Sequence, residues 1–550
     1  MLHAVALREM QGGSKILVDC WEGAESFRAL VPRHFRVPGA FAEQRDLIHA
    51  RNYSRETLRK VLKEQNAGFS APPIAQANIE RLADPKALVV IGGQQAGLFG
   101  GPLYTAHKAL TILALSENLE ASLGCPVIPL FWIASDDHDL VEVSHTYITD
   151  AAGKLKELAL HLEGANRLPL EGANRLPVSR IPLGQGVLTA LESLEAELPA
   201  TEFSTEILAR LRASYTAEAS FPQSFGAWMS YLFGDRGLVI VDPADARLKD
   251  LARPLFRKEI EEKSPVSRAV IEQSARLAAA GYPAQIALRP DMLTLFYHNP
   301  GREAMRIDGD RYSLASGAPR FALAELDALL ESDITRFSPN AALRPLYQDT
   351  LFPTLSVVLG PSELAYFSQL SLAYERMGIP MPVLFPRASL TLIEPKIKKL
   401  LDKYKISFGE VLARGERIAD ELARREIPDS LVGRLKDGSR DVARIWKELT
   451  EEIDRLDPTL RRTAELASGT SMKQFEFIEK KIAQAARKKD ETLRNQVEKI
   501  VSSLYPQGAL QERHLNSLPF LVRYGRDVLT RAWKGIDMFL PVHHGIEIEQ

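Results

Sequence analysis

The chain has 550 residues, of which 45% are hydrophobic and 25% are charged, and these ordinary values exclude a disordered chain, a collagen and a disulfide scaffold. The 69 lysines and arginines nearly balance the 71 aspartates and glutamates, so charge gives no reason to expect a nucleic acid or an anionic membrane as partner. The sequence has two cysteines, no apolar run long enough to span a bilayer and no signal-peptide pattern. It therefore predicts a cytoplasmic enzyme in a reducing compartment.

The first 80 residues predict short helices. Apolar residues recur at helical spacing between residues 41 and 69, and Pro72-Pro73 then interrupts the pattern before a further helix at about 74–82.

Residues 87–139 predict a βαβ unit. Its expected elements are a buried strand at 87–91, a glycine-rich loop at 92–101, a helix at about 103–123, a strand at 127–133 and an acidic loop at 135–139. Gly124 suits the C-terminal cap of the helix, whereas Pro129 is a mild objection to the second strand. A right-handed crossover would make the two strands parallel.

A similar layout returns later in the chain. A strand at 355–359, a helix at about 362–377 and a strand at 382–385 follow the same order, and 238–241 is a further strand candidate. Several parallel strands with helices between them predict an open α/β sheet, and the repeated layout suggests two related halves.

Residues 150–235, between the halves, are less regular and are interpreted as a connecting insertion. Here the eight residues 162–169 recur unchanged at 170–177. Such a duplication is best tolerated in an exposed loop, and two copies are too few for a binding repeat.

Residues 395–505 have a different composition, with 25 lysines and arginines and 20 aspartates and glutamates among 111 residues. Apolar residues recur four and three positions apart, which predicts two amphipathic helices with solvated outer faces. The first stripe, which Ser468-Gly469 interrupts, is Val442, Trp446, Leu449, Ile453, Leu456, Leu460, Thr463 and Ala467; the second is Phe475, Ile478, Ile482, Ala485, Leu493, Val497, Ile500 and Leu504. We expect an antiparallel coiled-coil domain at 395–505 and a core built from 1–394 and 506–550.

The glycine-rich loop is the strongest chemical signal. Glycines such as Gly93 and Gly97 would let the backbone approach a ligand, and Gln94 and Gln95 are costly inside such a loop unless they are hydrogen-bonded. The loop is not a P-loop, because Leu98-Phe99 stands where Lys-Ser/Thr is required, and it lacks the dinucleotide spacing. A tight strand-to-helix turn is the alternative interpretation.

The start of the following helix carries Tyr104, His107 and Lys108. A helix N-terminus presents free N–H groups to an anion, and a histidine and a lysine there could stabilise charge on a phosphate or carboxylate oxygen. The alternative is that both lie on the helix surface without a chemical role.

The run Asp136, Asp137, His138 and Asp139, with Glu142 and His145 downstream, follows the second strand, where open α/β sheets bind ligands. These groups could bind an amine, act as acid and base, or hold a divalent metal. A zinc site is the weaker interpretation, because the run offers no third nitrogen or sulfur ligand.

Four further groups are candidates for binding. Asn340 and Arg344 precede the second βαβ unit, Ser362 and Glu363 open its helix, and Arg387 follows its last strand. Each is equally well explained as scaffold or helix cap. There is no Gly-x-Ser-x-Gly sequence, and Cys125, at a strand start, is better explained as core than as nucleophile.

Two long motifs carry a family resemblance. Gly92-Gly-Gln-Gln-Ala-Gly-Leu-Phe-Gly-Gly-Pro-Leu-Tyr-Thr-Ala-His-Lys108 and the Phe-Trp-Ile-Ala-x-x-Asp-His-Asp run at 131–139 are similar to the bacillithiol biosynthesis cysteine-adding enzyme family, BshC. The similarity extends over most of the chain, through 338–340, 343–348, 378–383, 518–520 and 523–525. One departure is Leu359-Gly-Pro-Ser-Glu363, where the resemblance leads us to expect Gly-Gly-Pro-Gly-Glu.

The resemblance implies a ligase that adds L-cysteine to glucosaminyl-malate in the last step of bacillithiol synthesis. It implies a Rossmann-like core with connecting-peptide insertions and a coiled coil used for homodimerisation. It also implies ATP or ADP at the helix that holds His107, with carboxylate activation in the crevice. On this hypothesis an aspartate of 136–139 holds an amine and His138 takes a proton. Two alternatives stay open, a metal-dependent hydrolase or transferase using Asp136 to Asp139 and a coiled-coil scaffold.

Overall fold

The computed structural model describes residues 2–10, 14–162, 176–299, 301–415, 417–418, 429–489 and 491–549. The chain forms two compact units. The core unit consists of Met1–Leu392 and Gln511–Ile548, and the helical unit of Ile393–Leu510. Most of the duplication at 162–177 lies outside the described residues. Within the described ranges, no helix is both long and apolar enough to cross a membrane.

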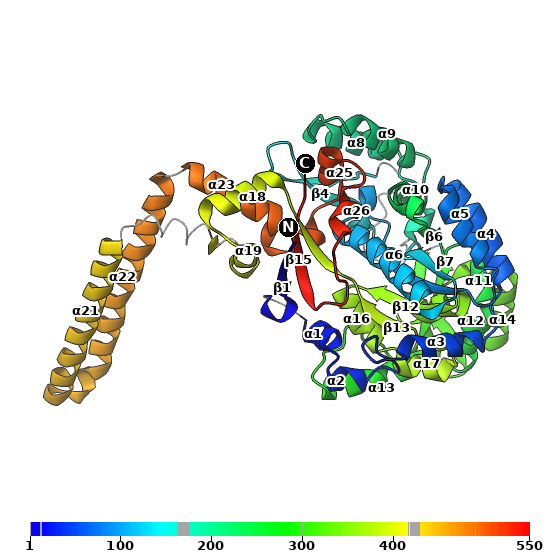
Figure 1. Ribbon diagram of the computed structural model, residues 1–550. Coiled ribbons are helices and arrows are strands. Elements are labelled where there is room, and N and C mark those ends of the chain that lie inside the picture. Colours follow the sequence, from blue (N-terminus) through cyan, green and yellow to red (C-terminus); the bar gives the residue numbers. More distant parts are fainter. Residues whose placement is uncertain are drawn as a thin grey trace. The chain divides into compact units, whose positions relative to one another are not determined.

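The centre of the core unit is a five-stranded parallel sheet (Figure 1). In spatial order its strands are β13 (Val383–Pro386), β12 (Thr354–Leu359), β2 (Leu88–Gln94), β3 (Val127–Ile133) and β6 (Val239–Val241). Every residue of β3 is buried, as expected for a strand covered on both faces. The open α/β sheet and all five strands near their expected positions are confirmed, Pro129 included.

Helix α6 (Leu103–Leu123) connects β2 to β3 and packs on both strands. It ends at Gly124, whose φ of 63° is the left-handed conformation of a C-terminal cap. The remaining helices of the first 90 residues are α1 (Lys15–Glu22), α2 (Glu25–Arg28), α3 (Ala40–His49), α4 (Arg55–Gly68) and α5 (Pro73–Arg81). Of these, α3, α4 and α5 pack against strands of the parallel sheet.

Two expectations for the first and second βαβ units were wrong in detail. Gly92 and Gly93 belong to β2, not to a loop, because they pair with Phe131 and Trp132 of β3. The single helix expected at about 362–377 is two helices, α16 (Pro361–Ser368) and α17 (Ser371–Met377). Between them the buried side chain of Gln369 accepts hydrogen bonds from the backbone of residues 285 and 286, so this position is tied to a different segment.

The insertion is more regular than its sequence indicates. After a hairpin of β4 (His145–Thr149) and β5 (Leu155–Ala159), it continues as α8 (Gly186–Glu197), α9 (Ser204–Ser214) and α10 (Phe221–Phe233). Residues 246–351 add α11 (Ala246–Leu251), α12 (Arg253–Glu261), α13 (Pro265–Ala279), α14 (Leu323–Ser332) and α15 (Leu343–Leu351).

A five-stranded antiparallel sheet was missed from the sequence. Its spatial order is β10 (Arg320–Ala322), β9 (Arg311–Leu314), β8 (Gly301–Asp308), β7 (Met292–Asn299) and β11 (Phe337–Pro339). The C-terminal segment returns to the core unit through α24 (Gln511–His514), α25 (Leu518–Tyr524) and α26 (Val528–Trp533). It ends in β15 (Val542–Glu547), which lies between β1 (Leu2–Ala6) and β14 (Ser389–Ile393).

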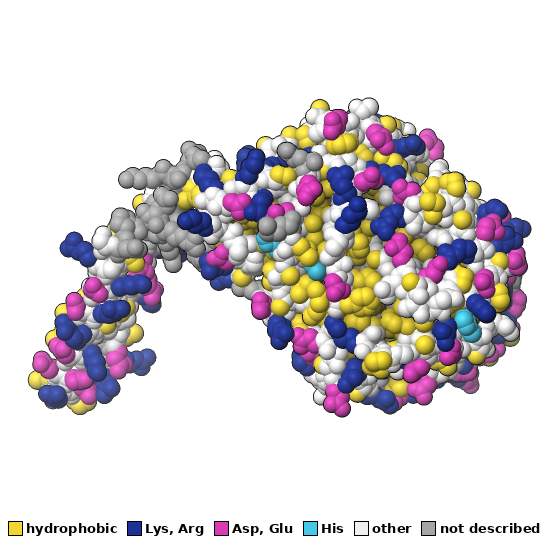
Figure 2. Space-filling model, viewed as in Figure 1, with side chains coloured by type: hydrophobic (Ala, Val, Ile, Leu, Met, Phe, Trp, Pro, Cys, Tyr) yellow, Lys and Arg dark blue, Asp and Glu magenta, His cyan; other side chains and the backbone are white. Residues whose placement is uncertain are grey.

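The helical unit contains a long antiparallel hairpin of α21 (Asp429–Leu456) and α22 (Arg461–Lys489), which lie side by side in Figure 1. The turn lies at Pro458, so the expected break at Ser468-Gly469 was wrong. Proline cannot continue the helix, and Asp457 accepts a hydrogen bond from the N–H of Thr459. Charged side chains of both signs cover the hairpin, with apolar side chains among them (Figure 2). The unit also contains α18 (Pro395–Tyr404), α19 (Phe408–Arg414) and α23 (Glu491–Leu504).

Candidate active site

A cavity of about 650 Å³ lies at the carboxyl ends of β2, β3 and β12. This is the edge of a parallel sheet where the order of strands reverses, the usual ligand site of an open α/β fold. Nine of the predicted site residues line the cavity: Gly93, Gln94, Gln95, Asp136, Asp137, His138, Asn340, Arg344 and Glu363. The other seven do not line it: Gly97, Tyr104, His107, Lys108, Asp139, Ser362 and Arg387.

The three aspartates that follow β3 have three different partners. Asp136 forms an ion pair of 2.9 Å with Lys249. Asp137 accepts hydrogen bonds from the side chain of Gln95 at 2.8 Å and from the backbone of His138 at 2.7 Å. Asp139 caps α7 (Leu140–Val143), a short helix that the acidic run opens. The run therefore supplies two carboxylates to the cavity, together with Glu142, whose pKa is raised by burial and by Asp139.

Arg302 reaches the cavity from strand β8 and has a side chain only 7% exposed. It donates to Nδ1 of His138 at 2.9 Å, to the carbonyl of Pro339 at 2.8 Å and to the hydroxyl of Ser338 at 3.2 Å. A guanidinium can only donate, so this contact requires Nδ1 of His138 as acceptor and assigns the ring proton to Nε2, although Oδ1 of Asp137 also lies 3.5 Å from Nδ1. In that state Nε2 of His138 is a hydrogen-bond donor.

Arg344 forms another cationic wall of the cavity. Its guanidinium donates to Gln348 and to the hydroxyl of Tyr366, each at 3.2 Å, and lies 5.8 Å from the ring centroids of Trp132 and Phe367. Among the described residues, no carboxylate oxygen lies within 4.0 Å of this guanidinium. An arginine held by neutral partners at a cavity wall is suited to bind a carboxylate or phosphate of a ligand.

Asn340 has a structural task beside its place in the cavity wall. Its side-chain oxygen accepts from the backbone N–H groups of Ala342 at 2.9 Å and Leu343 at 3.1 Å, which caps the start of α15. The carbonyl of Asn340 then accepts from the N–H of Arg344, so the cap fixes the turn from which Arg344 projects.

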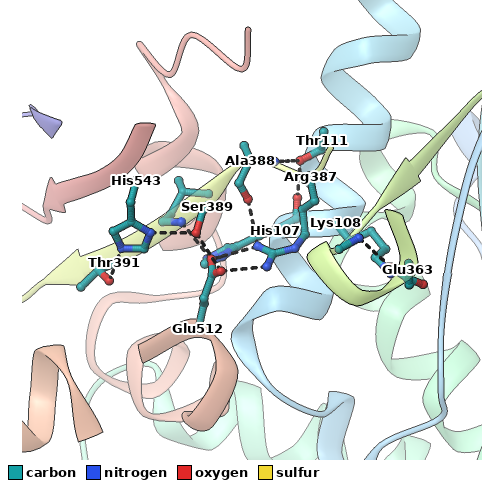
Figure 3. A network of polar contacts seen from close by, with 12 residues as sticks. His107, Lys108, Thr111, Glu363, Arg387, Ala388, Ser389, Thr391, Glu512 and His543 are labelled. Atoms are coloured by element: carbon teal, nitrogen blue, oxygen red, sulfur yellow. Dashed lines mark hydrogen bonds and ion pairs between the residues drawn. The ribbon is translucent and has the colours of Figure 1, made fainter. Parts of the chain in front are cut away.

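Lys108 lies directly behind the cavity wall. Its ammonium donates to the carbonyl of Gly93 at 2.5 Å, to Gln94 at 3.1 Å and to Glu363 at 2.5 Å (Figure 3). Burial lowers the pKa of Lys108, and Glu363 opposes that shift. Glu363 also accepts from the backbone N–H of Gly360 and so caps α16. One ion pair therefore joins the starts of the two crossover helices.

His107 belongs to a different, closed cluster around Glu512 (Figure 3). Glu512 accepts from Nδ1 of His107 at 3.0 Å, from both terminal nitrogens of Arg387 at 2.8 and 2.9 Å, and from the hydroxyl of Ser389 at 2.8 Å. The side chains of His107, Arg387 and Glu512 are at most 4% exposed. Although burial opposes it, Arg387 holds the pKa of Glu512 well below its usual value.

The first N–H group of α6 is already engaged within the protein. The N–H of Leu103, the first residue of the helix, donates to the carbonyl of Leu515, and Asn516 donates to the carbonyl of Gly101. The second half of the glycine-rich stretch packs on the insertion, since a side chain at Gly100 would meet Trp228 at 2.8 Å. A side chain at Gly93 would meet the carbonyl of Trp132 at 2.8 Å. Close packing therefore accounts for these glycines.

Three charged groups of the two clusters were missed from the sequence, namely Arg302, Lys249 and Glu512. Each lies far in the chain from its partner, and no local pattern marks any of them. Both cysteines are buried, and burial raises the pKa of Cys125, so the interpretation of this residue as core is confirmed. In the described part of the chain, no three His, Cys, Asp or Glu side chains are grouped to hold a metal ion.

Comparisons with known proteins support the family expectation. A model described as the N-terminal Rossmann-like domain of bacillithiol biosynthesis BshC matches residues 2–388, and one for its C-terminal coiled-coil domain matches residues 390–548. The chain belongs to the BshC family. Curated relatives each named “Putative cysteine ligase BshC” include proteins of Koribacter versatilis, 34% identical over 96% of both chains, and Salinibacter ruber, 32% identical over 86% of this chain and 85% of the relative.

A third relative of the same name, from Bacillus licheniformis, is 31% identical over 88% of this chain and 89% of its own. These matches cover most of this chain and most of each relative, and each relative is named as a ligase. The expected fold, a Rossmann-like parallel sheet with a coiled-coil domain, is confirmed by the two domain matches and by the structure.

Proposed function

We propose that this BshC-family chain is a ligase that joins the carboxyl group of L-cysteine to the amine of glucosaminyl-malate. The observation that carries the proposal is the distribution of charge in the cavity at the carboxyl edge of the sheet. Arg344 has no carboxylate partner among the described residues, and Arg302 lies in the same cavity as Asp137 and Glu142. A zwitterionic amino acid and an amine-bearing acid both need such paired, opposite charges.

The roles of the lining residues follow from what each group can donate or accept. Arg344 would hold a carboxylate through its planar fork, and Asp137 would accept from an ammonium. His138, whose Nδ1 accepts from Arg302, would donate from Nε2 to a carbonyl oxygen on which charge develops. This role differs from the proton acceptor that the sequence hypothesis gives to His138.

Amide formation from a free carboxylate requires activation, for which ATP is the proposed co-substrate. At the predicted phosphate site, the start of α6, the N–H of Leu103 donates to Leu515 and Nδ1 of His107 donates to Glu512, so this place is less suited to a nucleotide than the cavity wall. No step is therefore assigned to His107, although its Nε2 has no hydrogen-bond partner among the described residues. Arg302 and Arg344 are the cations of the cavity wall that would meet an anionic ligand.

The test is a mass-spectrometric assay with L-cysteine, glucosaminyl-malate and either ATP, ADP or no nucleotide. We expect a product heavier than glucosaminyl-malate by one cysteinyl residue, and the arm that yields it identifies the co-substrate. Asp137→Asn should lower kcat/KM by about 100-fold. The matched control is Asp310→Asn, which alters a carboxylate that is 99% exposed. Absence of product in every arm would refute the ligase proposal.

We also propose that the hairpin of α21 and α22 associates with a second copy of this chain. Ile445, Leu449, Leu466 and Phe477 are 42–66% exposed on the hairpin, more apolar surface than a solvated helix pair needs. We expect a dimer in light scattering and a monomer for Ile445→Glu combined with Leu466→Glu. Lys480→Glu, a charge change at an exposed position of α22, is the control. A monomeric wild type at micromolar concentration would contradict this.

A further inference from the structure

A second cavity of about 620 Å³ lies beside the first, where the insertion meets the β6 side of the parallel sheet. Its walls come from α4, from the segment at 177–180, from α9 and α10 of the insertion, and from the region that follows β6. None of the predicted site residues except Asp136 lines it.

The two cavities adjoin at the ion pair of Asp136 with Lys249. Asp136 is the one described residue that lines both, and its partner Lys249 lines the second cavity with a side chain only 3% exposed. Lys249 is also held by the carbonyl of Phe337 at 3.2 Å. Two ligands that occupy the two cavities would therefore meet at the carboxylate of Asp136.

His298 places a polar group on the wall of the second cavity. It is 6% exposed, and its Nδ1 has no hydrogen-bond partner among the described residues. Its Nε2 lies 3.0 Å from the hydroxyl of Ser338, which itself accepts from Arg302. A hydroxyl can both donate and accept, so either neutral tautomer of His298 satisfies the contact with Ser338. Nδ1 is left as a hydrogen-bonding atom without a partner among the described residues. Burial and the nearby cations, first Lys249, lower the pKa of His298 to about 3, so the ring is neutral.

The remaining lining combines hydroxyl groups with the charged side chains of Glu64, Arg180, Asp242 and Asp245. Hydroxyl groups of Ser179, Ser214, Thr216 and Thr335 line it, and Phe69 contributes an aromatic ring. Hydroxyls both donate and accept, so they pair well with the hydroxyls of a ligand, while an aromatic surface suits the apolar face of a sugar ring. The carboxylates of this wall are engaged within the protein, since Arg247 pairs with Glu64 and Asp245, and Ser135 donates to Asp242. A ligand with two full charges therefore fits the wall with Arg344 better than this one.

We propose that the second cavity is a subsite for a hydroxyl-rich pyranose, the sugar part of the acceptor substrate. The inference rests on the proposed ligase function, because it assigns the sugar to one cavity and the amino acid to the other. The sugar amine would then lie at Asp136, the residue that both cavities share. Nδ1 of His298 would form a hydrogen bond with a hydroxyl of the sugar, which can donate or accept.

Obstructing the cavity tests the proposal. Ala213 is an exposed residue of α9 that lines the second cavity, and Ala209 is an exposed residue of the same helix that does not. Ala213→Trp should raise KM for glucosaminyl-malate at least 10-fold and leave KM for cysteine within twofold, and Ala209→Trp should change neither. A smaller change, Thr216→Val, should raise KM for glucosaminyl-malate about threefold through the loss of one hydrogen bond.

A direct binding measurement separates this inference from the ligase proposal. Methyl β-D-glucosaminide, titrated by calorimetry, should bind the wild type and Ala209→Trp but bind Ala213→Trp at least 10-fold more weakly. If the sugar shows this pattern and no product ever forms, the subsite stands and the ligase proposal fails. If product forms and Ala213→Trp matches Ala209→Trp in KM, the subsite is refuted and the ligase proposal stands. No sugar binding together with no product would refute both.

Discussion

Two polar clusters of the core unit use the same kinds of side chain to different ends. In the closed cluster, Glu512 holds His107 and Arg387 with nearly no exposure to water. In the open cluster, Asp137, His138 and Arg302 carry the same three functional groups but line a cavity. Charges that are paired inside the core have little capacity left for a ligand, whereas those at a cavity wall keep some. In the closed cluster, only Nε2 of His107 has no hydrogen-bond partner among the described residues.

The difference also explains why a histidine at a helix start is an ambiguous signal. His107 lies in the second turn of α6, where it was predicted to meet a phosphate. The return of the chain at Gln511–His514 instead places Glu512 against it. The closed cluster thereby joins α6, the segment after β13 and α24, three segments that are distant in sequence.

The largest expected effect comes from breaking the closed cluster. Glu512→Gln removes the counter-ion of Arg387 and leaves a buried guanidinium without a carboxylate, which should cost about 3–5 kcal/mol in the free energy of unfolding. Chemical denaturation measures this. The control is Glu195→Gln, which breaks a similar fork with Arg212 on the surface and should cost less than about 1 kcal/mol. Equal losses in the two variants would contradict the comparison.

Arg344, on the wall of the cavity that the open cluster lines, should affect activity more than stability. Arg344→Met keeps the length and apolar contacts of the side chain but removes the planar fork, so kcat/KM should fall about 100-fold. The midpoint of thermal unfolding should move by only a few degrees, because Arg344 has no ion-pair partner to abandon among the described residues. If Arg344→Met unfolds more readily but its folded fraction keeps full activity, the role of Arg344 is structural.

Much of the open site could be predicted because its residues follow strands. Unbroken runs of β-branched and aromatic residues mark β2, β3 and β12, and polar groups just after parallel strands converge at one edge. That reasoning placed Asp136 and Asp137 at the ligand-binding edge of the sheet. Glu363, which also lines the cavity, was equally well explained as a helix cap.

The sequence could not predict contacts between side chains that only tertiary packing brings together. Arg302 lies on an antiparallel sheet that was not expected, and its approach to His138 depends on how that sheet docks. The ligand-binding interpretation of the glycine-rich loop failed for a related reason. A sequence shows that a side chain is absent at Gly93 or Gly100, but not whether Trp132, Trp228 or a ligand fills the space. Asp457-Pro458 was a readable turn signal that the heptad spacing obscured.

A reciprocal pair of substitutions sharpens the contrast between the two histidines. His107→Phe removes the donor to Glu512 inside the closed cluster and should cost about 1–3 kcal/mol of stability, with kcat/KM within about 10-fold of the wild type. His138→Phe should show the reverse, little change in stability and a fall in kcat/KM of about 10- to 100-fold. If His107→Phe has the stability of the wild type but loses its activity, His107 takes part in the reaction, as its sequence position suggested.

The smallest expected effect is on the pH dependence of stability, through His543 at the edge of the closed cluster. His543 hydrogen-bonds Ser389 and Thr391, and burial lowers its pKa to about 4. Below pH 6.5 the unfolded chain binds a proton at this residue that the folded chain does not bind until about pH 4. Stability is therefore lost as pH falls through this window, by about 1–2 kcal/mol at pH 5.

His543→Gln retains a donor and an acceptor but no titrating group, so its unfolding free energy should fall less between pH 7 and pH 5 than that of the wild type. Urea denaturation at the two pH values measures the difference. Between pH 7.5 and pH 8 both proteins carry a neutral group at position 543, and their curves should run parallel, which is the internal control. An equal acid sensitivity in wild type and variant would show that burial does not hold His543 neutral.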